Sequence, residues 1–242
     1  EQIEGGGRSE PTIQLAGFGL LMQYAWYFMT EARSRMPFTA YFSDAELSRM
    51  KASYSQEAGR KLSLNDALCG HLRSVIDQCD EGGPRERVLS LAVNIRRRCG
   101  FPDTLMGNPL TTMNLLCKKG ENPARIGAKI REALNSFHQE HLDFNANTHY
   151  VDSVGGRKKI MRMLPTGIDP RNHSLLVSTW SKFGIYGVEI AGQAPVFACG
   201  VPEVPLPWIS SLVEGFGNSG QLFSGVFPKD VVSRLSSEEY LR

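Results

Sequence analysis

Apolar residues recur at three- and four-residue intervals in several parts of the chain, which is the spacing of a helix with one buried face. Ser43 with Glu46 forms a plausible capping box, Ser63 can open a helix, and Pro123 suits a first helical turn. The pattern predicts helices at residues 14–36, 43–57, 63–79, 123–142 and 228–235. Pro37 is expected to end the first helix and residues 145–148 the fourth.

Shorter apolar runs bounded by turn residues alternate with these helices and predict strands. They lie at residues 88–95, 110–117, 175–180, 195–199 and 221–227, with a turn at 80–84. Because helices and strands alternate and the last third is rich in strands, the fold class is a mixed α/β (α+β) protein.

Composition narrows the function classes only slightly. The 27 basic and 25 acidic residues give a net charge of +2, too even for a nucleic-acid-binding surface. No stretch is apolar for 18 residues, so we expect no membrane span. Five separate cysteines without a CxxC pair indicate neither a disulfide framework nor a zinc site, and they favour a cytoplasmic location.

Three segments, in order, resemble the C-terminal part of the BAHD-type CoA-dependent acyltransferases, which have the chloramphenicol-acetyltransferase-like fold. Residues 63–72 are similar to a family helix. Arg96 and Arg98 lie in a segment that is similar to the family's VNxRxR motif, and a Gly107-Asn108 pair follows it. Residues 178–180 and 186–196 occupy the place of the family's SW and DFGWG stretches, although the latter reads Glu189-Ile-Ala-Gly-Gln here.

The resemblance implies one half of a two-domain fold, with a central mixed sheet flanked by helices. We therefore expect residues 1–12 to be a flexible lead-in, 13–60 a helical segment and crossover, and 61–242 the C-terminal acyltransferase-like domain. An isolated half is expected to expose apolar surface where its partner half docks.

The family's catalytic HxxxD motif is absent, because none of the five histidines has an aspartate four residues later. The resemblance places the general-base histidine on a missing N-terminal half of the same protein. The chain is then a fragment, one piece of a nicked or two-chain enzyme, or a degenerate relative without activity.

Site residues follow from the resemblance. Ser178 and Trp180 match positions lining the family's channel, where a hydroxyl can donate to an oxyanion; alternatively, Trp180 is a core residue of a strand. Glu189 would form a structural ion pair with Arg96 or Arg98. Asn108 would close a turn or contact substrate.

Other polar residues are weaker candidates. A strand at Arg96–Arg98 would send Arg97 to the opposite face, so at most two of these arginines could act together on CoA phosphates. Residues 157–159 are expected to be a solvated charge run, with contact to the CoA 3′-phosphate as the alternative. His71 is expected to be a core histidine, and His138 with His141 lacks a third ligand, so no metal site is expected.

The resemblance therefore implies an acyltransferase that moves an acyl group from acyl-CoA, a co-substrate rather than a permanently bound cofactor, to a hydroxyl or amine on a small-molecule acceptor. Two alternatives remain open. One is a non-catalytic scaffold that kept the fold, and the other is a condensation-type domain that uses carrier-protein thioesters.

Overall fold

The computed structural model describes residues 11, 13–107, 109–136, 144–165, 169–181, 184–197 and 207–237. The helices are α1 (Phe18–Met29), α2 (Asp44–Glu57), α3 (Leu64–Cys79), α4 (Pro123–Ser136), α5 (Phe144–Ser153) and α6 (Lys229–Leu235). The strands are β1 (Ile13–Leu15), β2 (Arg35–Phe42), β3 (Glu86–Asn94), β4 (Leu110–Lys118), β5 (Met163–Pro165), β6 (Leu175–Thr179), β7 (Ile209–Glu214) and β8 (Gln221–Pro228).

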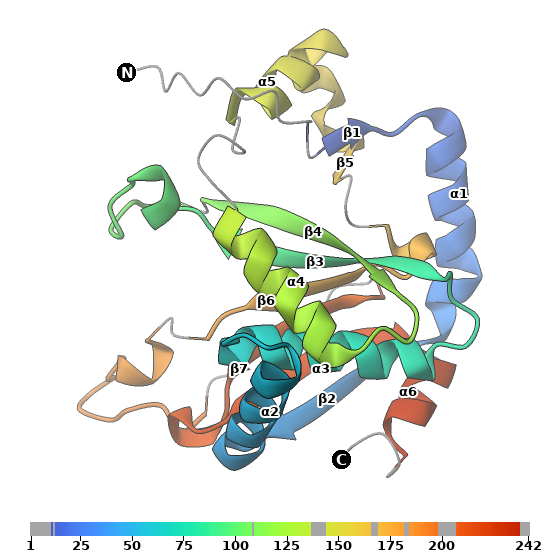
Figure 1. Cartoon of the computed structure of the whole chain (residues 1–242). Coiled ribbons are helices and arrows are strands. Elements are labelled where there is room, and N and C mark those ends of the chain that lie inside the picture. The colour runs from blue at the N-terminus through green and yellow to red at the C-terminus, as the bar shows by residue number, and fades with distance from the viewer. Residues whose placement is uncertain are drawn as a thin grey trace.

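A six-stranded mixed sheet forms the centre of the molecule, with the strand order β2-β8-β7-β6-β3-β4 (Figure 1). Strands β3, β6 and β7 are parallel to one another, so their carboxyl ends lie at the same edge of the sheet. The other pairings are antiparallel. The expected mixed α/β class with a central mixed sheet is confirmed.

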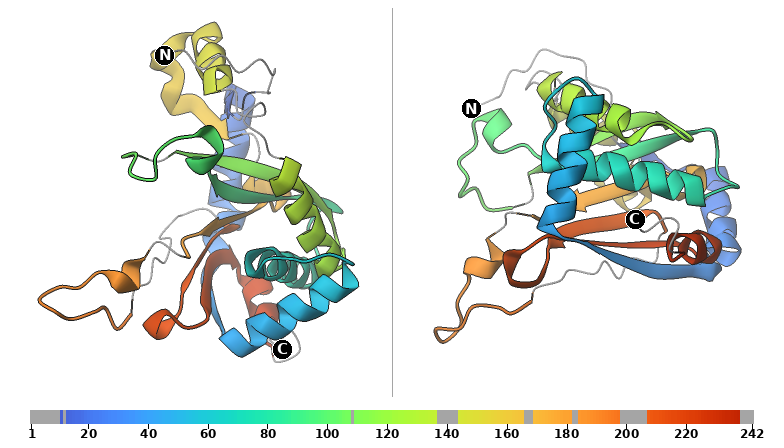
Figure 2. Two further views of the ribbon diagram at one scale, coloured as in Figure 1. Left: turned by 60° about the vertical axis from the view of Figure 1, so that its left-hand side comes forward. Right: turned by 60° about the horizontal axis from the view of Figure 1, so that its bottom comes forward.

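Helices α2, α3, α4 and α6 cover one face of this sheet (Figure 2). The main hydrophobic core lies between the helices and the sheet. It joins Leu68, Ile76 and Ile126 of the helices to strand residues such as Leu89 and Phe223, all fully buried. Burial of such side chains supplies most of the free energy that drives a domain to fold.

Two capping boxes start the helices where the sequence predicts. Ser43 caps α2 with Glu46, and Ser63 caps α3 with Asp66. In each box the serine hydroxyl accepts from a backbone N–H of the first turn, and the acid accepts from the serine N–H. The helix boundaries are thus determined by local hydrogen bonds as well as by packing.

Helices α3 and α4 approach each other closely through two glycines. A Cβ atom added at Gly70 would overlap the carbonyl oxygen of Pro123 and would lie 3.0 Å from the nitrogen of Gly127. A side chain at Gly70 is therefore incompatible with this helix packing.

A smaller layer holds the remaining elements (Figure 1). Strands β1 and β5 form a two-stranded antiparallel sheet, and the Tyr150 hydroxyl of α5 accepts from the Leu15 N–H at 2.9 Å. Helix α1 stands at the side of the molecule, where only Tyr27 is fully buried. Helix α1 contacts Arg171, whose guanidinium lies 4.8 Å from the centre of the Tyr24 ring.

The expectation of one helix over residues 14–36 is wrong. Helix α1 ends at Met29, and β2 begins at Arg35 and includes Pro37. Proline is tolerated there because β2 is an edge strand, which leaves one side of its backbone without a ladder partner. Since β2 pairs with β8 along its whole length, the sheet draws strands from both sides of residue 60.

Two further expectations fail. Residues 145–148 do not end a helix but lie within α5. Residues 195–197 are not a strand, and 198–199 lie outside the described residues. The remaining strand predictions match β3, β4, β6 and β8 within two residues at each end, and the C-terminal helix matches α6.

Candidate functional site

The carboxyl end of β6 carries the residues expected to act on a thioester. The Trp180 indole N–H donates to the Ser178 hydroxyl oxygen at 2.9 Å. Alternate strand residues face opposite sides, so Thr179 points the other way, and its hydroxyl donates to the Asn65 side-chain oxygen at 3.0 Å. Trp180 is 41% exposed, so it is not a core residue.

Asn65 lies in the first turn of α3, and hydrogen bonds and an ion pair hold this turn in place. The neighbouring Asp66 carboxylate accepts from Ser63 at 2.7 Å and from the Arg131 guanidinium at 2.8 Å. Because Asp66 is fully buried and bridges α3 to α4, the α3 N-terminus is held in place. The bond from Thr179 to Asn65 then ties the end of β6 to this fixed point.

A cavity of about 540 Å³ opens at the same edge of the sheet, beyond the end of β7. Among the described residues, its lining is Gly184, Tyr186, Gly187, Ala194, Pro195, Glu214, Gly217 and Asn218. Most of these residues come from the loop after β6 and the turn after β7. The cavity therefore lies at the same edge of the sheet as Ser178 and Trp180, but its described lining includes neither residue.

The structure gives Arg96 partners other than Glu189. The Arg96 guanidinium donates to the carbonyl oxygens of Leu105 and Gly107, at 3.1 and 2.9 Å. Glu189 lies exposed in the loop after β6, and Arg98 has a contact within the protein. The expected pair of Glu189 with Arg96 or Arg98 stays a prediction. Asn108 lies outside the described residues.

The expected alternation of the three arginines is wrong. Strand β3 ends at Asn94, and Arg97–Cys99 form a 3₁₀ turn rather than a strand. Arg97 instead forms an exposed ion pair with Asp103 at 3.0 Å. Residues 157–159 lie in another 3₁₀ turn, Gly156–Arg162, in which Arg157 and Lys158 are exposed.

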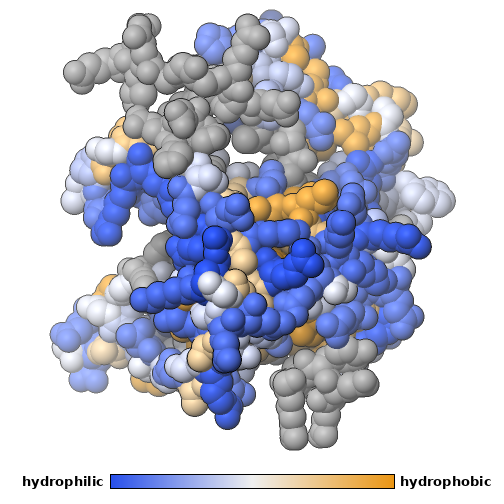
Figure 3. Space-filling view, in the orientation of Figure 1, coloured by the Kyte–Doolittle hydropathy of each residue, from blue (hydrophilic) through white to orange (hydrophobic). Residues whose placement is uncertain are grey.

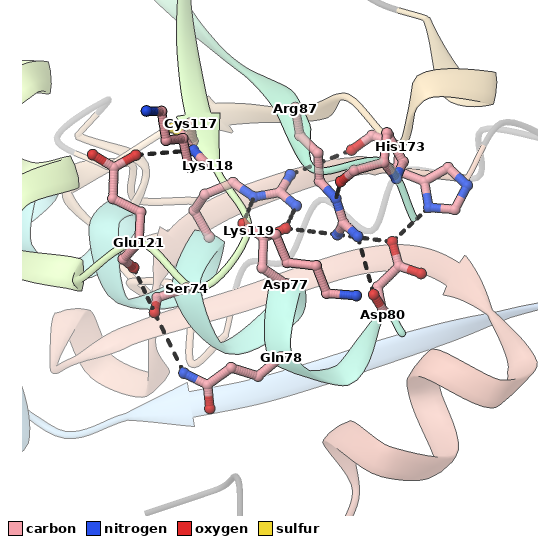
Figure 4. A network of polar contacts seen from close by, with 12 residues as sticks. Ser74, Asp77, Gln78, Asp80, Arg87, Cys117, Lys118, Lys119, Glu121 and His173 are labelled. Carbon is pink, nitrogen blue, oxygen red and sulfur yellow. Dashed lines mark hydrogen bonds and ion pairs between the residues drawn. The ribbon is translucent and has the colours of Figure 1, made fainter. Parts of the chain in front are cut away.

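A buried network of charged groups, which no sequence motif indicated, joins α3, β3 and the start of β6 (Figure 4). The Arg87 guanidinium contacts the carboxylates of Asp77 at 2.6 Å and Asp80 at 2.8 Å. Arg73 donates to Asp77 at 3.0 Å and to the His173 carbonyl at 3.3 Å. His173 contacts Asp80 through Nδ1 at 2.5 Å and stacks on the buried Trp208, with ring centres 4.6 Å apart.

The network balances its charges, since two arginines face two aspartates that are all nearly inaccessible to solvent. Burial lowers the pKa of both Arg73 and Arg87. It would raise the pKa of Asp80, but the hydrogen bond and charge of His173 and the charge of Arg87 outweigh it, and this pKa lies below its ordinary value. The network lies at the start of β6, whereas Trp180 follows the end of that strand. Because the network and the candidate site are at opposite ends of β6, we assign the network a role in stability.

The lowered pKa of Asp80 predicts acid sensitivity. A carboxylate whose pKa is lower in the folded state stabilises the fold above its ordinary pKa of about 3.9. That contribution is lost as the pH falls through the folded-state value. Urea unfolding of the native chain and of Asp80→Asn should therefore differ most near neutral pH, with the difference shrinking as the pH falls below about 4. A difference that does not change with pH would contradict this assignment.

The histidines differ in their surroundings. His71 of α3 is mostly buried, and its Nδ1 shares a hydrogen bond of 2.9 Å with the Tyr54 hydroxyl of α2. Burial lowers the pKa of His71. His138 and His141 lie outside the described residues. Within the described part of the chain, no cluster of three or more potential ligands could hold a metal ion. No helix there has the length and apolar character needed to cross a bilayer.

No protein-family model and no curated protein matches the chain, but solved structures do. TRI101 of F. graminearum, complexed with coenzyme A and deoxynivalenol, matches with a TM-score of 0.67 at 18% identity over 86% of this chain and 48% of that one. TRI101 of F. sporotrichioides, complexed with coenzyme A and T-2, has a TM-score of 0.66 at 16% identity over 86% and 50%.

Vinorine synthase matches with a TM-score of 0.65 at 15% identity over 83% of this chain and 46% of that one. The chain thus spans about half the length of the structures it matches. These structures are of the BAHD acyltransferase type that the sequence motifs resemble. At these identities the likeness establishes the fold, and the expected half of a chloramphenicol-acetyltransferase-like fold is confirmed.

Proposed function

We propose that this chain is one half of an acyl-CoA-dependent acyltransferase, the C-terminal half, which transfers an acyl group to a hydroxyl or amine acceptor. The observation that carries the proposal is the match, over most of this chain, to about half of structures that were complexed with coenzyme A. Acyl-CoA is the co-substrate in this proposal, and the acceptor is a small molecule.

The contact between Trp180 and Ser178 supports a role in stabilising charge. The indole N–H fills one lone pair of the Ser178 oxygen, so the hydroxyl hydrogen remains available to a ligand. In the proposed reaction a general base on the other half takes a proton from the acceptor. The acceptor attacks the thioester carbon, and Ser178 donates to the resulting oxyanion. The C–S bond then breaks, and the CoA thiolate takes the proton back from the base.

Helix α1 supports the proposal that a further half docks here. Its outward face carries five apolar residues with exposed fractions between 39% and 76%: Phe18, Leu21, Met22, Trp26 and Met29. Figure 3 shows hydrophobic side chains gathered at the upper right of the molecule, where Figure 1 places β1 and the start of α1. An apolar helix face of this size is typical of a surface that another domain covers. We propose that the HxxxD-bearing half covers it.

Mixing experiments test the function. The chain is combined with a separately produced upstream half that contains HxxxD, and release of free CoA thiol from acyl-CoA is measured with an alcohol or amine acceptor. We expect release only with both halves. Replacing Ser178 with alanine should lower the rate about 10²–10³-fold, as expected for the loss of one oxyanion donor. Ser53→Ala, at an exposed position of α2, is the matched control.

The outcome separates the leading proposal from a non-catalytic relative of the fold. Two folded, associated halves that release no thiol would support that alternative and would overturn the acyltransferase proposal.

A further inference from the structure

The six-stranded sheet ends in two edge strands, β2 and β4, and their sequences differ in how they protect the edge (Figure 1). Strand β2 begins with the charged Arg35 and contains Pro37, which has no N–H to offer a new neighbour. Strand β4 has neither a proline nor a charged residue between Leu110 and Leu116. Because an unprotected edge can bind another strand, proteins usually guard such an edge with proline, charge or a bulge. The sequence of β4 therefore leaves it open to a partner strand.

The hydrogen bonds to β3 show which backbone groups of β4 point away from the sheet. The Lys119 N–H donates to the Arg85 carbonyl oxygen at 2.7 Å, and the Ile95 N–H donates to the Pro109 carbonyl oxygen at 3.1 Å. In an antiparallel pair, bonded and non-bonded residue pairs alternate, so the odd-numbered residues of β4 bond to β3. The N–H and C=O groups of its even-numbered residues therefore point outward, toward the free edge.

Two charged side chains close one end of this edge. The Glu121 carboxylate accepts from the Lys118 N–H at 3.0 Å, and the Lys129 ammonium donates to the Leu116 carbonyl oxygen at 3.3 Å. Lys129 and Glu121 also form an ion pair at 2.6 Å. In the described part of the chain, no other hydrogen bond reaches the outward backbone groups between that carbonyl and the start of β4. The open edge is therefore residues 110–116.

The open edge is complementary to a second copy of itself. Antiparallel pairing about its centre places Leu110 opposite Leu116 of the second copy. These leucines are 41% and 55% exposed, so the pairing would bury apolar surface that is now in water. The same register places Thr112 opposite Asn114. The Asn114 side-chain oxygen accepts from the Ser90 hydroxyl at 2.7 Å, so its amide N–H groups are oriented as donors for the opposing threonine.

We infer that two copies of this chain form a twofold dimer in which their β4 strands pair antiparallel, with Leu110 of each copy opposite Leu116 of the other. The outward N–H and C=O groups then gain partners, and the two six-stranded sheets become one continuous sheet. Because β2 is protected, each copy offers one edge of this sheet, and association closes at two copies. The inference rests on the sheet and does not depend on the proposed acyltransferase activity.

Two matched double variants test the register, with sedimentation velocity at micromolar chain concentrations as the measurement. We expect the native chain to be a dimer. Leu110→Lys with Leu116→Lys would place lysine opposite lysine, whereas Leu110→Glu with Leu116→Lys would place glutamate opposite lysine. Both variants lose the same two exposed leucines, so they differ in the sign of one charge. The first should dimerise about tenfold more weakly than the second, because like charges that face each other across two strands repel.

Thr112→Pro tests the backbone contacts without changing any charge. The Thr112 N–H points outward, so proline removes a donor that the second copy needs and leaves the bonds to β3 in place. We expect this variant to be a monomer. Trp26→Ser, on the exposed face of α1, is the control for association through that helix, and it should leave the dimer intact. Circular dichroism would verify that each variant is folded.

Three results would overturn the inference while leaving the acyltransferase proposal to its own test. The native chain could be a monomer or a polydisperse aggregate at these concentrations. The two double variants could dimerise equally well. Thr112→Pro, correctly folded, could remain a dimer, and loss of the dimer in Trp26→Ser would then assign association to α1. If Thr112→Pro does not fold, the two double variants decide the question alone.

Discussion

Replacing Arg87 with methionine should destabilise the protein by about 3–5 kcal/mol, the usual cost of removing one partner from a buried ion pair. The guanidinium contacts both Asp77 and Asp80 and donates to two backbone carbonyls, those of Pro84 and Asp80. Methionine fills a similar volume but leaves two buried carboxylates with less compensation. Urea unfolding at neutral pH, followed by circular dichroism, would measure the change.

The exposed pair of Arg97 with Asp103 is the matched control for this experiment. Arg97→Met removes the same kind of ion pair, but one in which both side chains are mostly in solvent. We expect little change in the free energy of unfolding, because water solvates the aspartate that remains. If Arg87→Met and Arg97→Met had equally small effects, the buried network would not contribute to stability as we describe.

Gly70→Ala should also destabilise the protein, with a loss of about 1–3 kcal/mol. One methyl group at this position overlaps the Pro123 carbonyl oxygen, so α3 and α4 must move apart. Their separation would loosen the packing around Ile126, which is fully buried against the same core. Thermal and urea unfolding would report the loss.

Gly19→Ala gives the opposite expectation within another helix. A Cβ atom at Gly19 meets no heavy atom within 4 Å, and the residue lies in α1. Alanine is favoured over glycine by about 0.5–1 kcal/mol in the middle of a helix. Gly19 lies in the first turn, so we expect a smaller gain, with this variant at least as stable as the native chain. If both alanine variants shifted stability in the same direction, the close approach at Gly70 would not be the cause.

Much of the helical part of the fold could be predicted from local signals. Ser43 and Ser63 open helices through hydrogen bonds within four residues, so no knowledge of the rest of the chain is needed. Strand β7 could not be predicted, because its sequence Ile209–Glu214 mixes serines with apolar residues and lacks a simple alternation of apolar and polar positions. It is nevertheless a central strand, because β6 and β8 pair on both sides of it.

The candidate site likewise combines residues that local sequence indicates with residues that only the folded chain brings together. Ser178 and Trp180 could be selected from motif text, and their mutual hydrogen bond is local in sequence. The cavity beyond β7 could not be predicted, because its described lining comes from loops that meet only in the folded chain. The buried charges were missed because Asp80 and Arg87 resemble ordinary surface residues. The one local signal is the spacing of Arg73 and Asp77, four residues apart beside the apolar stripe of α3.

The pairing of β2 with β8 has a consequence for biosynthesis. Arg35 pairs with Pro228, so the edge strand of the sheet must wait for a segment made nearly two hundred residues later. During translation β2 emerges from the ribosome well before β8, so it lacks this strand partner until β8 follows. Such long-range closure slows folding and leaves an apolar strand exposed to other nascent chains. Chaperone dependence during synthesis should therefore be greatest before β8 emerges from the ribosome.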